Sequence, residues 1–161
     1  LTTYPAGHSQ QNVMLTLAGT GKLSFSLDMK IAASDLTIGQ IIALDIDVPD
    51  GPGVQDHSFY IESYDGSFQM SESVGTTDGG PTSYTATPLI DVVPNGAWTH
   101  LDLTIDGSTG AMELAVDGTP RTVAPAQAGF PAGTVRVNLG GYGERLPNGA
   151  TSAIDNLIVD P

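Results

Sequence analysis

The chain has 161 residues, of which 40% are hydrophobic and 14% charged, a composition typical of a single globular domain. Five Lys and Arg against 18 Asp and Glu give a formal net charge of -13, which excludes the basic surface needed for nucleic acid or an anionic membrane. The absence of cysteine excludes a disulfide framework, a thiolate metal site and a cysteine nucleophile.

Apolar and polar residues alternate with a period of two along most of the chain, and 20 Gly and 11 Pro interrupt the alternation. This pattern predicts an all-β protein, an antiparallel sandwich or barrel without an amphipathic helix. We expect strands, in chain order, at Asn12–Leu17, Lys22–Ile31, Gln40–Val48, His57–Tyr64, Ser67–Val74, Trp98–Ile105, Ala111–Val116, Thr134–Leu139 and Ala153–Val159, with a weaker candidate at Thr119–Val123.

Glycine-containing turns separate several of these strands. Asp106–Gly110 and Asp117-Gly118 supply the positive φ angles that hairpin turns need. We expect longer loops at Pro49–Asp56 and Thr76–Pro88. Neither an internal repeat nor a domain linker is visible, so we expect one domain over residues 1–161.

Four segments of the second half carry a family resemblance. They are Trp98-Thr-His-Leu-Asp-Leu-Thr-Ile105, Gly110-Ala-Met-Glu-Leu-Ala-Val-Asp-Gly118, Val135-Arg-Val-Asn-Leu-Gly140 and Ile154-Asp-Asn-Leu-Ile-Val159. In order and spacing they resemble the closing strands of the concanavalin A-like lectin/glucanase superfamily, the laminin G-like branch most of all. The resemblance implies an antiparallel jelly-roll β-sandwich of two curved sheets, with glycans bound on the concave face or at the rim loops.

The resemblance does not extend to a catalytic set. Retaining glucanases of this superfamily place two carboxylates on one strand, because a nucleophile and an acid/base must flank one glycosidic bond. The corresponding segment, His57–Tyr64, has only Glu62 on the face shared with Tyr60 and Tyr64. Asp45 and Asp47 lie one strand too early, and we interpret them as the solvated side of that strand. We therefore predict no catalytic residues.

The resemblance does suggest a glycan-binding face. Tyr60 and Tyr64 would offer aromatic surfaces to sugar rings and Glu62 would accept hydroxyl hydrogen bonds. Further along the chain, Arg136 and Asn138 are candidate donors, and Tyr142 is a candidate contact from a neighbouring loop. The alternative is an ordinary solvated sheet face without a ligand.

Many sandwiches of this superfamily bind one structural calcium ion near the equivalent of Asp155-Asn156. Calcium prefers oxygen ligands, and the net charge of -13 favours its binding, so we predict a calcium site at Asp155. Gln11 and Asn12 are candidate sources of further carbonyl ligands. The alternative is a buried Asp155 that hydrogen-bonds the backbone.

The tryptophan and the three histidines, which could in principle contact a ligand or a metal ion, are interpreted as structural. We expect Trp98 to pack in the core beneath a loop, as the family usually places a core aromatic there; the alternative is a role in stacking against a sugar. His8, His57 and His100 lack the spacing of a metal site and are expected at the surface or beside strands.

Together these observations predict a non-catalytic carbohydrate-binding or adhesive domain with a glycan or polysaccharide as its partner. The carboxylate-rich composition with few lysines favours a secreted bacterial protein at the cell surface or outside the cell, attached to or derived from a larger protein. No apolar run approaches the roughly 20 residues needed to cross a bilayer, so we expect no membrane insertion. Two alternatives remain: a self-assembling subunit of a surface layer or filament, and a diverged glycoside hydrolase or polysaccharide lyase that uses Glu62.

Overall fold

The computed structural model describes residues 2–4, 7–10, 13–18, 21–32, 40–47, 54–64, 67–76, 83–88, 96–123, 134–139, 142–146 and 150–160. These residues form fourteen strands and contain no helix. Accordingly, the described part of the chain offers no helix of the length and apolar character that a membrane span requires.

The strands form two sheets in which every pairing is antiparallel. One sheet has six strands in the order β1 (Thr2–Tyr4), β14 (Ala150–Asp160), β4 (Lys22–Ala32), β9 (Thr99–Asp106), β10 (Ala111–Val116) and β11 (Thr119–Arg121). The other has eight strands, six of them in the order β2 (Gly7–Gln10), β13 (Tyr142–Leu146), β5 (Gln40–Asp47), β6 (Val54–Tyr64), β7 (Ser67–Thr76) and β8 (Ser83–Pro88). Its remaining strands are β12 (Thr134–Leu139), which pairs with β5, and β3 (Val13–Ala18), which pairs with β12.

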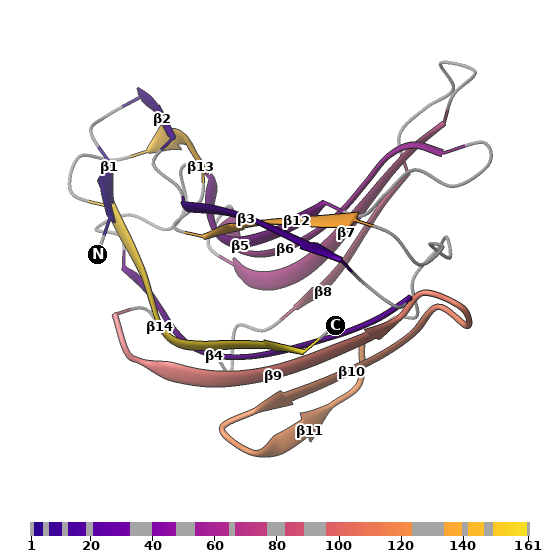
Figure 1. Ribbon diagram of the computed structural model, residues 1–161. Helices are drawn as coiled ribbons and strands as arrows, with labels where there is room; N and C mark the ends of the chain where they lie inside the picture. The colour runs from indigo at the N-terminus through magenta and orange to yellow at the C-terminus, as the bar shows by residue number, and fades with distance from the viewer. Residues whose placement is uncertain are drawn as a thin grey trace.

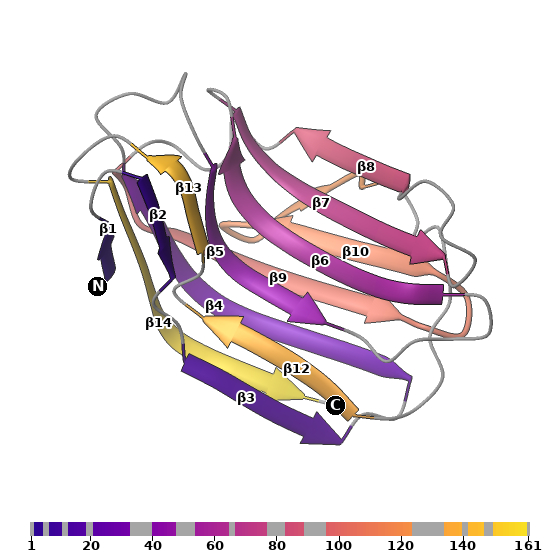
Figure 2. The ribbon, with the colours of Figure 1, turned by 90° about the horizontal axis from the view of Figure 1, so that it is seen from above.

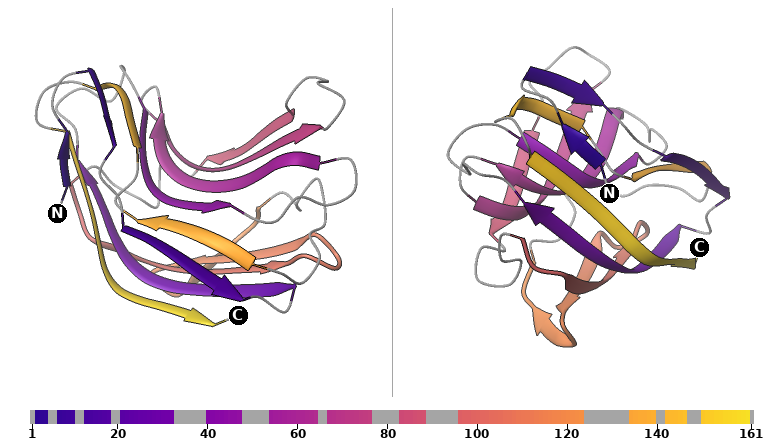
Figure 3. Two further views of the ribbon diagram at one scale, coloured as in Figure 1. Left: turned by 45° about the horizontal axis from the view of Figure 1, so that its top comes forward. Right: turned by 90° about the vertical axis from the view of Figure 1, so that its left-hand side faces the viewer.

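The two sheets are stacked and curve in the same direction (Figure 1). In the left view of Figure 3, β5, β6 and β7 are bent strands whose hollow side faces away from the six-stranded sheet. The outer face of the eight-stranded sheet is therefore concave, and we call this sheet the concave sheet. The six-stranded sheet lies beneath it, and we call it the convex sheet because its outer face bulges towards solvent.

Alternating burial explains how the sheets hold together. In β4, every second residue from Leu23 to Ile31 is buried, and β9 repeats the pattern at Leu101, Leu103 and Ile105. The concave sheet contributes an opposing set of apolar side chains to the same core: Ile46, Phe59, Ile61, Met70 and Val137. This single core between two sheets confirms the predicted antiparallel jelly-roll sandwich.

The strands with alternating apolar residues were predicted within a few residues of their observed bounds. β11 confirms the weaker candidate, although it ends at Arg121. The predicted loop at Thr76–Pro88 is wrong in its second half, because Ser83–Pro88 forms β8. Strands β1, β2 and β13 were also missed. β8, β1 and β2 are outermost strands in their sheets, and the described side chains of β8 are mostly exposed, without apolar alternation.

Two hairpin turns form as their sequences predicted. The Asp106 carboxylate accepts hydrogen bonds from the backbone N–H and hydroxyl of Ser108, at 2.9 and 2.6 Å, and this holds the turn between β9 and β10. Between β10 and β11, Asp117 and Gly118 have φ angles of 48° and 73°, as in a two-residue turn.

One polar pair lies inside the core. His57 and Glu72, only 1% and 3% exposed, are joined by a 2.7 Å contact between Nε2 and Oε1. Glu72 is the cross-strand partner of Phe59, and the His57 ring lies 4.7 Å from the Phe59 ring, centroid to centroid. The prediction of a surface or strand-flanking position is therefore wrong for His57.

Replacing one member of this pair leaves the other buried without the partner that lies 2.7 Å away. We expect His57→Leu and Glu72→Met each to lower the free energy of unfolding by about 2 to 4 kcal/mol. The double variant is expected to be more stable than either single variant, because both polar groups are then gone. Urea unfolding of the four proteins measures this, and strictly additive losses would contradict the coupling.

Candidate functional site

The strand register places three of the predicted binding residues, Tyr60, Glu62 and Arg136, on the outer face of the concave sheet. Arg136 on β12 pairs with Asp47 on β5, which pairs with Ser58 on β6, and this row continues across β7 to Tyr84 on β8. A second row runs from Asn138 on β12 through β5 to Tyr60 on β6. Figure 2 shows these strands side by side, seen from above.

A buried carboxylate organises the part of this face that lies over β6, β7 and β8. Glu62 follows the core residue Ile61 in β6, and consecutive side chains of a strand point to opposite faces, so the Glu62 side chain is on the outer face. It is nevertheless only 1% exposed. Its Oε1 atom accepts hydrogen bonds from the Ser71 hydroxyl at 2.6 Å, the Tyr84 hydroxyl at 2.8 Å and the Gln69 amide at 3.1 Å. This convergence of donors compensates for removing the carboxylate from water.

The same contacts fix the position of Tyr84. Its hydroxyl lies 2.8 Å from both Gln69 Nε2 and Ser71 Oγ, in addition to its bond to Glu62. Glu62 is on β6 and Tyr84 on β8, so the tyrosine side chain reaches across β7. Tyr84 is nevertheless 53% exposed, which makes it a large aromatic side chain open to solvent on this face.

Tyr84 was missed in the sequence because its segment was interpreted as a loop. The available signal was the turn sequence Asp78-Gly-Gly-Pro81, followed by the β-favouring residues Tyr84, Thr85 and Thr87. That signal indicates a hairpin partner for β7 but not the long-range bond to Glu62.

The predicted ligand-binding residues have different environments. Tyr60 is half-buried, Arg136 is exposed and Glu62 lies beneath the surface. Tyr64, Asn138 and Tyr142 lie in β6, β12 and β13, where the structure describes their backbone register. Tyr142 was expected in a loop, but it begins strand β13. A ligand contact at each of these residues stays a prediction.

A second polar cluster lies on the outer face of the convex sheet. The His100 ring donates from Nδ1 to Asp28 Oδ1 at 2.8 Å, and the Asn156 amide donates to Asp28 Oδ2 at 2.5 Å. The hydrogen bonds from Asn156 and His100 hold the pKa of Asp28 below its ordinary value of 3.8. The bond to Asp28 raises the pKa of His100 above 6.5.

A bulge in β14 positions this cluster. The register between β14 and β4 shifts between Asp155 and Ile158, and Asn156 has a φ of 52°. As a result, Asp155 and Asn156 are both exposed beside Asp28, although they are consecutive in a strand.

The described residues around Asp155 leave the predicted calcium site untested. Asp155 is exposed and its Oδ1 atom accepts the backbone N–H of Asn156 at 2.9 Å, while both oxygens of Asp28 already accept hydrogen bonds. Within the described ranges, no three acidic or histidine side chains are grouped closely enough to hold a metal ion. Gln11 and Asn12 lie outside the described residues. Calcium at Asp155 stays a prediction.

Trp98 corrects one prediction. It was expected to pack in the core beneath a loop, but it is 51% exposed. Trp98 precedes β9, in which the inward-facing positions are Thr99, Leu101, Leu103 and Ile105. The alternation that buries Thr99 therefore turns Trp98 outward.

The His100–Asp28 pair predicts a direction of pH dependence. A raised pKa of His100 means that its stabilising contribution is complete below about pH 6.5 and is lost as the pH rises through the folded-state pKa. We therefore expect His100→Gln to lower the unfolding midpoint temperature at about pH 5.5 and to have a smaller effect at about pH 8.5. The effect is modest because both side chains are solvent-accessible. An equal loss at both pH values, measured by calorimetry, would show that the pair does not titrate as described.

No family model matches this sequence, and no curated protein matches it. Among solved structures, it is similar to the galectin LEC-6 of Caenorhabditis elegans, with a TM-score of 0.57, 13% identity, and coverage of 96% of this chain and 94% of the galectin. The carbohydrate-binding module CBM66 of Bacillus subtilis matches with a TM-score of 0.52 and 9% identity, over 98% of this chain and 84% of the module.

An enzyme is also similar in fold. The family 7 alginate lyase A1-II′, solved with a substrate, matches with a TM-score of 0.54 and 18% identity, over 88% of this chain and 62% of the lyase. These likenesses, together with the two curved antiparallel sheets, confirm the fold expected from the sequence. The chain has the concanavalin A-like lectin/glucanase fold.

Proposed function

We propose that this chain is a non-catalytic carbohydrate-binding domain that holds a glycan on the outer face of its concave sheet. The observation that carries the proposal is the exposed Tyr84 ring, whose hydroxyl is held by the buried carboxylate of Glu62. The carbohydrate-binding module and galectins of similar fold support the same class of function.

A fixed aromatic ring suits a sugar because the C–H groups of a pyranose ring form an apolar face. The Tyr84 hydroxyl already donates to Glu62 and accepts from the Gln69 amide, so little side-chain entropy remains to be lost when a ligand stacks on the ring. Glu62 thereby acts as a positioning residue beneath the surface. The expectation from the sequence that Glu62 itself accepts a hydrogen bond from a sugar hydroxyl is separate from this positioning role and stays a prediction.

Polar groups elsewhere on the concave face would contact other units of a bound polysaccharide. Arg136 is exposed and shares the register row that ends at Tyr84, while Tyr60 lies in the adjacent row next to Ser71. An exposed guanidinium donates hydrogen bonds to hydroxyl or carboxylate oxygens of a polysaccharide. The face thus combines stacking with a small number of polar contacts, as sugar sites commonly do.

We further propose that the domain acts outside the cell as part of a larger protein. The support is compositional: the chain has 18 Asp and Glu but only five Lys and Arg. The charge of -13 favours neutral or cationic glycans over strongly acidic ones, except where Arg136 compensates locally.

Binding is tested by a glycan array followed by calorimetric titration with the best ligand. Tyr84→Ala should weaken affinity about two- to tenfold, since an aromatic contact contributes roughly 0.5 to 1.5 kcal/mol. Arg136→Ala should weaken it as well. The matched control is Ile158→Ala, which removes an exposed apolar side chain from the convex sheet and should leave affinity unchanged.

Absence of binding to any glycan would remove the proposal. An affinity that Ile158→Ala lowers as much as Tyr84→Ala would place the site on the other sheet. Tyr84→Phe separates stacking from positioning, because the ring stays while the bond to Glu62 is lost. We expect this variant to lose about 1 to 2 kcal/mol of stability and only part of the affinity.

Glycan cleavage is the second candidate, favoured by the likeness to the alginate lyase and by the Tyr84–Glu62 hydroxyl–carboxylate pair. Under this candidate, incubation with alginate and other polysaccharides produces new chain ends, and Glu62→Gln abolishes their formation while the protein stays folded. Product formation that is unchanged in Glu62→Gln would reject a role for this pair. Binding without any product would support the non-catalytic function.

A further inference from the structure

The hydroxyl group of Tyr84 has its hydrogen-bonding capacity taken up by the protein. It donates to Glu62 Oε1 at 2.8 Å and accepts from the Gln69 amide at 2.8 Å, and Ser71 Oγ is a third polar neighbour at 2.8 Å. A phenolic hydroxyl has one hydrogen and two lone pairs, so three such neighbours account for its capacity. A ligand on this ring therefore meets carbon atoms rather than the hydroxyl.

The polar residues that hold this hydroxyl lie beneath the surface. Glu62 and Ser71 are almost fully covered, and Gln69 is only 8% exposed, whereas the Tyr84 side chain above them is exposed. Over this part of β6 and β7, the surface offered to a ligand is the aromatic ring and not the polar side chains under it.

Two further residues of β8 extend this carbon surface. Tyr84, Ala86 and Pro88 alternate along the strand, so they share its outer face, and all three are exposed. Ala86 is the cross-strand partner of Ser71, and Pro88 is that of Gln69. Because the Tyr84 hydroxyl contacts both of these partners, its side chain leans along the strand towards Ala86 and Pro88. We call Tyr84, Ala86 and Pro88 the apolar strip.

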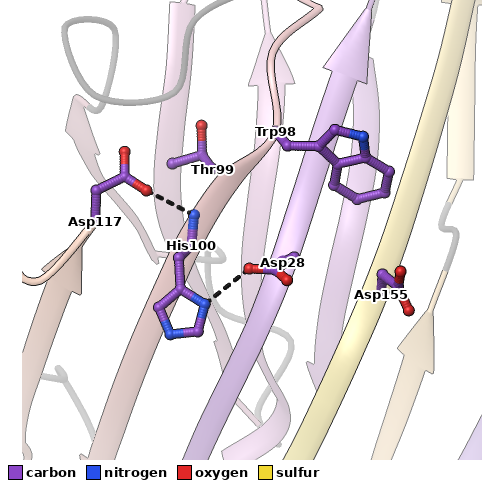
Figure 4. Close-up of a pocket in the computed structure, with 6 residues that line it drawn as sticks. All are labelled: Asp28, Trp98, Thr99, His100, Asp117 and Asp155. Atoms are coloured by element: carbon purple, nitrogen blue, oxygen red, sulfur yellow. Dashed lines mark hydrogen bonds and ion pairs between the residues drawn. The ribbon is translucent and has the colours of Figure 1, made fainter.

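Trp98, an exposed aromatic residue of the convex sheet, has different surroundings. It borders a pocket of about 370 Å³ whose other lining residues are Asp28, Thr99, His100, Asp117 and Asp155. Figure 4 shows its indole reaching from the start of β9 across β4 towards β14, with polar side chains beside it. A ligand on this indole meets carboxylates and an imidazole, whereas a ligand on the apolar strip meets carbon.

The direction of the oxygen atoms on a sugar decides whether it fits a carbon surface. A pyranose whose hydroxyls and linkages are all equatorial has only C–H groups on its two faces, and its chain is a flat ribbon. An axial oxygen projects from one face, and pressing it against carbon removes its water without supplying a hydrogen bond. The apolar strip therefore distinguishes sugars by configuration rather than by hydrogen bonds to particular hydroxyls.

We propose that the apolar strip selects flat, equatorially linked pyranose chains, such as the glucose chain of cellulose and the xylose chain of xylan, over chains with axial linkages. This inference rests on the proposed glycan site and names its ligand class. The Tyr84 ring stacks on one face of a sugar unit, and Ala86 and Pro88 contact C–H groups beside it.

Calorimetric titration with cellohexaose and maltohexaose tests this selection. The two hexasaccharides are isomers with the same number of hydroxyls, and they differ in having equatorial or axial linkages. Cellohexaose should bind about five- to tenfold more tightly, since the axial oxygens of maltohexaose lose water without gaining a partner. Xylohexaose lacks the hydroxymethyl groups but keeps the equatorial linkages, so its affinity should be close to that of cellohexaose.

Two pairs of variants locate the selection. Tyr84→Ala should bring the affinities for the two hexasaccharides close together, while Trp98→Ala, which removes an exposed aromatic ring from the convex sheet, should leave their ratio unchanged. Ala86→Asp places a hydrated carboxylate on the strip and should weaken cellohexaose binding about threefold or more. Its matched control is Ala111→Asp, at an exposed alanine of β10, which should not weaken it.

The outcomes separate this selection from the proposed function. Equal affinity for the two hexasaccharides, or tighter binding of maltohexaose, would overturn the selection and leave the glycan site standing if Tyr84→Ala weakens both. Binding of other glycans but of neither hexasaccharide would overturn it as well. A preference that Trp98→Ala abolishes and Tyr84→Ala preserves would assign it to the convex sheet. Absence of binding to every glycan would remove the proposed function itself.

Discussion

The arrangement of the concave face depends on the burial of one carboxylate. Glu62 lies on the outer side of β6 but is almost fully covered, and an uncompensated charge in such a place is strongly unfavourable. Its compensation comes from Gln69 and Ser71 on β7 and from Tyr84 on β8. The carboxylate therefore links three neighbouring strands through side chains, in addition to their backbone ladder, and determines where the Tyr84 ring is presented.

The two outer faces of the sandwich have different chemistry for a structural reason. On the concave side, the network around Glu62 is buried within the face, and the aromatic ring above it is exposed. On the convex side, the bulge at Asp155 and Asn156 brings two consecutive polar residues outward beside Asp28. The first arrangement favours stacking against a flat apolar ligand, and the second concentrates negative charge around an indole.

Sequence alone predicted the sandwich because most of its strands bury one face, and burial of one face imposes a period of two. The β4 segment is the clearest case, with five apolar residues alternating inward from Leu23 to Ile31. The same rule did not detect β8, an outermost strand with mostly exposed side chains. Tyr84, which lies in β8, was therefore not predicted as a site residue. The position of His57 was predicted wrongly because the local sequence pattern does not reveal its buried pairing with Glu72. The position of Trp98 was predicted wrongly because the pattern does not show that the side chain before β9 points outward.

The central claim is that Tyr84 and its neighbours on the concave sheet contact a glycan. Hydrogen–deuterium exchange with and without soluble polysaccharides tests it by location, since bound ligand slows exchange in the strands that it covers. The account predicts slower exchange at residues 83–88 and 54–64, with the convex-sheet residues 99–106 unchanged. Protection confined to 99–106, or protection nowhere with any polysaccharide, would contradict it.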